Sequence, residues 1–254
     1  MIKRTLFLAT AVAIASPLYA QDKLSTFLGA DYSSGNYGTT STTTVASMPM
    51  GIKYETENLT LKASLPWLRV TAPTGTSLGP DGRPSSGGTG IRRTESGAGD
   101  LVTSLTWMAY NNSTTGIAID LTGKVKWGTA DAGKGLGTEK NDLSAQVDFY
   151  KSLGKTALFT TLGYKVFGDP AGINFRNVPY AGIGFSHKTS SLTAVGLTWD
   201  YRPKVVETGK HTSELTGFMT HKLSDSTKAQ LYLVKGLSDG SPDWGGGLSL
   251  SHSN

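Results

Sequence analysis

Three patterns in this chain bring together residue types that could do chemistry. Ser stands beside His at Ser186–His187 and at Ser251–His252, and these are the groups that nucleophilic hydrolysis uses. A glycine-rich stretch ending in lysine, residues 128–134, resembles a phosphate-binding loop. Residues 116–127 alternate apolar side chains with an aspartate and two lysines. Each pattern requires a different surrounding structure, and that requirement separates them.

The first two patterns lack part of what their chemistry needs. Hydrolysis requires the imidazole within hydrogen-bond reach of the serine and a third group that orients it. His187 and His252 fall near the ends of predicted strands, where an outward polar ring is tolerated. A phosphate-binding loop needs Ser or Thr after its lysine and a following helix, whereas Gly135 follows Lys134 and the next segment predicts a strand. Residues 128–134 are therefore predicted to form a flexible loop, and a lipid hydrolase is kept as an alternative function.

The third pattern has the period of a β-strand, because successive side chains of a strand point to opposite faces. Residues 116–127 place apolar side chains on one face and Asp, Thr and Lys on the other. Transmembrane barrels repeat such segments, apolar toward lipid and polar toward the interior. We predict an all-β fold, a single antiparallel up-and-down transmembrane barrel of about twelve strands. The predicted strands cover residues 24–32, 45–54, 59–70, 101–110, 116–127, 143–150, 157–167, 180–188, 192–202, 214–222, 229–235 and 244–252.

Two further patterns support a barrel in the bacterial outer membrane. Short connections alternate with long ones, as periplasmic turns alternate with extracellular loops, and an even strand count puts both termini on the periplasmic side. Aromatic residues gather toward both ends of the strands, as in the girdles of membrane proteins. Those toward the long connections are Trp67, Trp127, Tyr164, Trp199, Tyr201 and Trp244, and those toward the short turns are Tyr54, Trp107 and Phe149.

The N-terminus and the composition agree with export. Lys3 and Arg4 precede an apolar run over residues 6–15, followed by small residues up to Ala20, which predicts a signal peptide over residues 1–20 and a barrel domain over residues 21–254. An uncleaved anchor is the alternative, but the run is shorter than the roughly 20 residues that a spanning helix needs. The 24 basic and 19 acidic residues form no stripe, which argues against a nucleic acid partner. Without Cys, and without a metal spacing among the four His, no metal site or cofactor is predicted.

Charged residues on the predicted inward faces are the candidate site. Rings of charge inside a barrel can select the solutes that pass, or can pair with one another and fill the interior. Lysines outnumber aspartates among the more central members, which favours anionic or polarised solutes. By strand parity the inward charges are Asp31, Lys53, Lys62, Asp120, Lys124, Lys126, Asp148, Lys165, Asp200, Arg202, Glu214 and Lys222.

The longest connection, residues 71–98, is rich in Gly, Pro and Ser and contains Arg83, Arg92 and Arg93. It could fold into the interior as a constriction, or lie outside and meet the anionic groups of lipopolysaccharide. A mobile, solvated loop is the third possibility. If the loop binds other surfaces, the protein would be a structural or adhesive barrel.

Several segments resemble a known family. The similarity is to the outer-membrane transporters of the phenol meta-degradation pathway type. It is carried by residues 124–131 and 134–138, the Gly163–Tyr164 pair with residues 168–170, residues 200–202 and residues 236–245. The resemblance implies an outer-membrane barrel that passes small solutes, and it carries over no catalytic residue. One departure is the C-terminus, Ser-His-Ser-Asn, where such barrels usually end in an aromatic residue read by the assembly machinery.

Together these patterns predict a passive channel, not an enzyme, with a narrow lumen, and with small anionic or aromatic solutes as the candidates. Its expected partners are outer-membrane lipids and lipopolysaccharide, the solute, and the outer-membrane assembly machinery.

Overall fold

The computed structural model describes residues 22–79, 82–84 and 90–254, so the predicted signal peptide lies outside the described residues. Within these ranges the chain is all-β, and no helix is long and apolar enough to cross a membrane. The strands are β1 (Lys23–Gly35), β2 (Thr43–Glu55), β3 (Leu59–Pro73), β4 (Arg92–Ala98), β5 (Val102–Asn112), β6 (Ile117–Lys126), β7 (Asp142–Leu153), β8 (Thr156–Val166), β9 (Val178–Lys188), β10 (Thr193–Arg202), β11 (Thr212–Lys222), β12 (Thr227–Gly236) and β13 (Trp244–Ser253).

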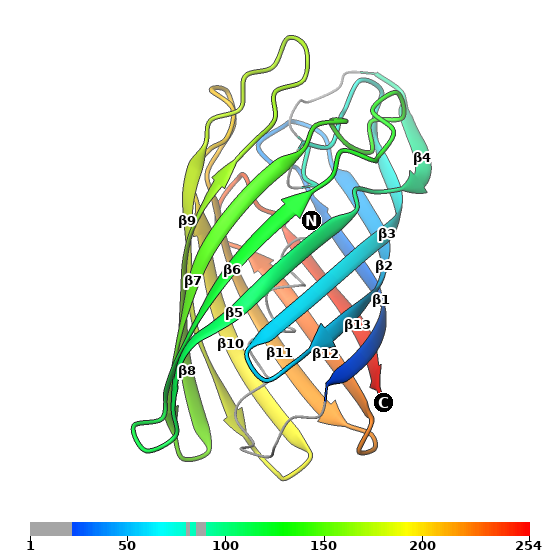
Figure 1. Ribbon diagram of the computed structural model, residues 1–254. Helices are drawn as coiled ribbons and strands as arrows, with labels where there is room; N and C mark the ends of the chain where they lie inside the picture. Colours follow the sequence, from blue (N-terminus) through cyan, green and yellow to red (C-terminus); the bar gives the residue numbers. More distant parts are fainter. Residues whose placement is uncertain (1–21, 80–81, 85–89) are drawn as a thin grey trace.

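The strands close into an antiparallel barrel, tilted relative to its axis (Figure 1). Neighbours in the chain are neighbours in the wall, and β1 closes the barrel by pairing with both β2 and β13. Twelve strands form the closed wall and β4 is additional, so the predicted fold is confirmed. Closure leaves no open edge, as a wall in lipid requires.

The additional strand corrects the sequence prediction for residues 71–98. There β3 continues to Pro73 and β4 pairs with its upper part, whereas β5 pairs with its lower part, Leu59–Ser64. Strands β4 and β5 are thus two pieces of one interrupted strand. The interruption lies beside Pro66, which has no N–H to donate and whose carbonyl accepts from Gly99. Strand β4 has polar residues on both faces, so it carried no alternation to detect.

The connections alternate in length as predicted. Five short turns lie at one end of the barrel, and the longer connections lie at the other, uppermost in Figure 1. Ser25 pairs with Ser253, so the first and last strands have their outer ends together at the short-turn end. The two ends of the described chain therefore lie at the same end of the barrel.

The two faces of the wall differ in polarity. Large apolar side chains cover the outside, and all nine predicted girdle aromatics are exposed there, from Tyr201 at 36% to Trp244 at 54%. One predicted orientation is wrong. Strict alternation along the predicted strand 101–110 places Tyr110 on the inward face with Ser104 and Thr106. A bulge between Met108 and Tyr110 shifts the register, so that Tyr110 pairs with outward-facing Ile119.

Candidate functional site

The interior of the barrel is the candidate site. Ten of the twelve predicted inward charges are the proposed pore-lining residues, namely Lys53, Lys62, Asp120, Lys124, Lys126, Asp148, Lys165, Asp200, Arg202 and Glu214. The alternation of burial along each strand places all ten on the inward face. Many inward side chains are buried. Partners and register then divide nine of these ten residues into distinct groups, and Arg202 is buried at the long-connection end of β10.

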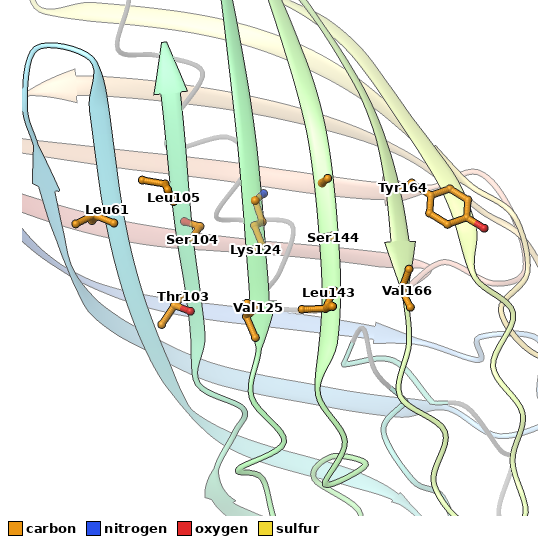
Figure 2. Close-up of a pocket in the computed structure, with 12 residues that line it drawn as sticks. Leu61, Thr103, Ser104, Leu105, Lys124, Val125, Leu143, Ser144, Tyr164 and Val166 are labelled. Carbon is orange, nitrogen blue, oxygen red and sulfur yellow. The ribbon is translucent and has the colours of Figure 1, made fainter. Parts of the chain in front are cut away.

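Strand register aligns four of the lysines into one row. Lys53 pairs with Lys62, Lys62 with Ser104, Ser104 with Lys124, Lys124 with Ser144, and Ser144 with Lys165. Figure 2 shows Ser104, Lys124 and Ser144 at corresponding places on three adjacent strands. Because the strands are tilted, the row climbs from the short-turn end of β2 to the long-connection end of β8. We call these four residues the basic row.

A second row carries the opposite charge. In the strand register, Asp120 pairs with Asp148 and Asp200 pairs with Glu214. Thr161 of β8 and Gly182 of β9 occupy the register positions between these two pairs. On β6 and β7 this acidic row lies nearer the short turns than the basic row. Asp148 accepts hydrogen bonds from Gln146 (2.6 Å) and Thr161, and Thr198 donates to Asp200 at 3.4 Å. The wall is therefore polarised, with two parallel spirals of opposite charge.

Lys126 lies outside both rows and is held by carboxylates. Its Nζ is 2.8 Å from Asp100 Oδ2 and 3.3 Å from Asp142 Oδ2, and it donates to the Lys140 carbonyl at 2.9 Å. The residue is only 3% exposed. Lys126 was proposed to line the pore, but these contacts join β6, β7 and the segment before β5.

Arg83 brings the longest connection into the mouth of the barrel. It forms an ion pair with Glu214 and donates to the Gly240 carbonyl at 2.8 Å. Strand β3, from which the connection leaves, lies five strand steps from β11 in one direction and seven in the other. Arg83 therefore reaches across the mouth to β11, a position consistent with the constriction alternative for this connection. Arg92 and Arg93 instead lie exposed on β4.

Apolar and neutral groups fix this crossing segment in place. Leu78 is 1% exposed and packs in a cluster of residues from β2, β3 and the connection between β6 and β7. The Leu78 N–H donates to the Gly135 carbonyl at 2.9 Å. Gly135 directly follows residues 128–134, so the end of this loop contacts the segment that carries Arg83. Tyr37, between β1 and β2, is also buried, and burial raises its pKa to about 12, so its phenol stays neutral.

Aromatic residues also line the inside of the barrel, and the sequence pattern did not predict them. Five of them pair directly across strands with glycines, and each ring lies over the bare backbone of its partner. A methyl group at Gly196 would lie 2.2 Å from Phe218 Cζ. The rings thus lie along the wall and line it with apolar surface. The pairs are Phe27–Gly51, Phe159–Gly184, Tyr180–Gly163, Phe218–Gly196 and Tyr232–Gly247.

Neither Ser–His pair forms a hydrolytic site. Ser186 is buried on the inward face of β9 and His187 is exposed on the outer face, because they are neighbours in a strand. His187 Nδ1 is hydrogen-bonded to Thr156 Oγ1 (2.9 Å), and His252 Nδ1 to Thr227 Oγ1 (3.0 Å). Among the described residues no group of three His, Cys, Asp or Glu could hold a metal ion.

A groove of about 540 Å³ lies on the wall over β3 to β8 (Figure 2). Its side chains are mostly outward and apolar, among them Leu61, Leu105 and Leu143. Gly123 is part of its lining, and a side chain there would meet nothing within 4 Å. The inward-facing Ser104, Lys124 and Ser144 also belong to the lining, so the groove reaches from the apolar outer face to residues of the charged interior.

An apolar outer face, a charged interior and a closed wall define a β-barrel of the outer-membrane type. No family model and no curated protein matches the chain. Among solved structures, the COG4313 outer membrane channel from Pseudomonas putida F1 is similar, with a TM-score of 0.67 and 16% identity over 94% of this chain and 97% of that one. The translocator domain of autotransporter NalP from Neisseria meningitidis has a TM-score of 0.56, with 10% identity over 98% of this chain and 93% of that one. The KdgM porin has a TM-score of 0.51, with 6% identity over 89% and 98%. These similarities establish the fold.

Proposed function

We propose that the protein is an outer-membrane channel through which small solutes diffuse passively, with its short-turn end in the periplasm. The observation that carries the proposal is the basic row, which runs along the interior from one end of the wall to the other. Charged side chains at membrane depth are energetically costly, and they usually mark a solute or ion pathway. Channels use ordered rings of such charges to select the ions that pass. A similar fold in an outer membrane channel agrees with this role. The meta-pathway transporter family is the proposed placement.

Within this proposal, the side chains have different roles. Lys53, Lys62, Lys124 and Lys165 favour anionic solutes, and the inward rings supply apolar surface for an organic body. Lys126 and the Arg83–Glu214 pair stabilise the mouth. Arg92 and Arg93, exposed at the long-connection rim, are proposed to meet lipopolysaccharide.

Single-channel recording in a planar bilayer tests the proposal. The folded, purified protein should give discrete conductance steps that are selective for anions. Lys124→Glu should shift the reversal potential toward cations, and Lys151→Glu, which changes an outward-facing lysine of β7, should not. A folded and inserted protein that carries no current would contradict the channel and would favour the structural or adhesive alternative.

A further inference from the structure

Lys62 differs from the other buried lysine of the wall in its surroundings. It is 8% exposed, and no described carboxylate lies within ion-pair distance of it. Its Nζ instead lies 4.5 Å from the centre of the Phe27 ring. Glu55, on β2 beside the basic row, forms an ion pair with Lys53 at 2.7 Å. A buried ammonium is costly without an anion beside it, so these surroundings are incomplete.

A second buried group near Lys62 also lacks a partner. Ser64 follows Lys62 on the same face of β3 and is 1% exposed, and its hydroxyl makes no hydrogen bond with the described residues. Buried polar groups are nearly always hydrogen-bonded, so this hydroxyl is available to donate to a bound group. Ser104 is the cross-strand neighbour of Lys62, and Lys124 is the next member of the row. An ammonium and a hydroxyl are both donors to an oxyanion.

An apolar ring lies on the wall opposite Lys62. Strand β10 lies six strand steps from β3 in either direction, so it faces β3 across the interior. Lys62 is the fourth residue of β3, and Gly196 is the fourth residue of β10, both counted from the short-turn end. The ring of Phe218 covers Gly196. The interior therefore offers donors on one side, with Phe27 beside them and Phe218 opposite.

We propose that Lys62 and Ser64 form a binding site for a small organic carboxylate, with the carboxylate on these two donors and the apolar body between Phe27 and Phe218. This assignment rests on the proposed channel and names its solute class. Lys53 and Lys124 add positive charge on either side along the row, so that an anion can enter and leave in steps.

Isothermal titration of the folded protein in detergent tests the site without any current. Butyrate is the probe, and butyramide is the neutral analogue of the same size. Butyrate should bind the wild type, and Lys62→Met should weaken it by about tenfold, the effect of losing a hydrogen bond to a charged group. Lys62→Arg should restore much of the affinity, and Ser64→Ala should weaken it less. Lys151→Met is the matched control with no expected effect.

Other outcomes would overturn the site. Equal butyrate binding by Lys62→Met, or none by the folded wild type, would refute it. Butyramide binding as tightly as butyrate would exclude a charge-based site. Tighter binding of inorganic phosphate than of butyrate would refute the proposed contact between the apolar body of the ligand and the Phe27 and Phe218 rings. Recording current on the same samples separates the two proposals. Butyrate binding without current supports the site and contradicts the channel, whereas current without binding does the reverse.

Discussion

Lys62 and Lys126 are the same residue type on the same face of the wall, and both are buried, yet their surroundings are opposite. Lys126, near the long connections, lies between Asp100 and Asp142. Lys62, near the short turns, lies beside Phe27, with no described carboxylate in ion-pair distance. At the mouth, Lys126 is thus neutralised by two carboxylates, whereas in the lower interior Lys62 is neutralised by no described carboxylate. Two equally buried lysines can therefore have different roles. The groups that surround each lysine, and not its burial, distinguish a charge that stabilises the fold from one that is available to a solute.

The largest expected effect is on the mouth. Lys126→Met leaves Asp100 and Asp142 together without their cation, which should lower the free energy of unfolding by about 3–5 kcal/mol. Urea unfolding of the protein refolded into lipid vesicles measures this. Lys62→Met should leave the free energy unchanged or raise it, because an apolar side chain of similar size removes an unpaired buried charge. Equal decreases in the free energy of unfolding for Lys126→Met and Lys62→Met would show that the two lysines have the same structural role.

The Arg83–Glu214 pair should behave like Lys126, with an added effect on conductance. Arg83→Ala leaves Glu214 buried without its partner and should cost about 3 kcal/mol. It also frees the crossing segment, so single-channel conductance should rise. The double variant Arg83→Ala/Glu214→Ala should recover part of the stability while keeping the higher conductance. If Arg83→Ala leaves the conductance unchanged, the segment does not constrict the mouth.

The lower interior depends on rings that lie on glycines, which gives a smaller effect on stability. Gly196→Ala places a methyl group 2.2 Å from Phe218 Cζ and 2.4 Å from the Phe185 carbonyl oxygen. Such overpacking should cost about 1–3 kcal/mol, measured by the same urea unfolding. Gly123→Ala is the matched control, because nothing lies within 4 Å of the added methyl. A loss of equal size at Gly123 would mean that the cost comes from the backbone and not from the ring.

The fold followed from the sequence because alternation is a local property. Neighbouring residues alone predict the wall strands, the two faces of each strand and the alternation of turn lengths. The prediction fails only where side chains do not alternate strictly between apolar and polar. It failed at Tyr110, where a bulge adds one residue, and at β4, whose two faces are both polar.

The partners of the inward charges could not be predicted in the same way. Lys62 and Lys126 have the same parity, and only the folded connections bring Asp100 beside Lys126 and Arg83 beside Glu214. Register is also a relation between strands. It aligns Lys53, Lys62, Lys124 and Lys165, although 112 positions separate the first from the last. The interior rings were overlooked because apolar side chains were assigned to the lipid face, and the glycines across from them were the signal that could have identified them.

The smallest expected effect on stability, and the most specific effect on function, comes from reversing one charge of the basic row. Lys62→Glu should change the anion-to-cation permeability ratio severalfold in favour of cations, because the charge changes where no described carboxylate compensates it. The reversal potential under a potassium chloride gradient measures this ratio. Lys151→Glu is the control for a charge change outside the lumen. Lys126→Glu is not a suitable control, because it adds a third carboxylate beside Asp100 and Asp142 and should prevent folding. If Lys62→Glu and Lys151→Glu give the same reversal potential, ions do not pass Lys62, and the charges of the lower interior are as structural as those of the mouth.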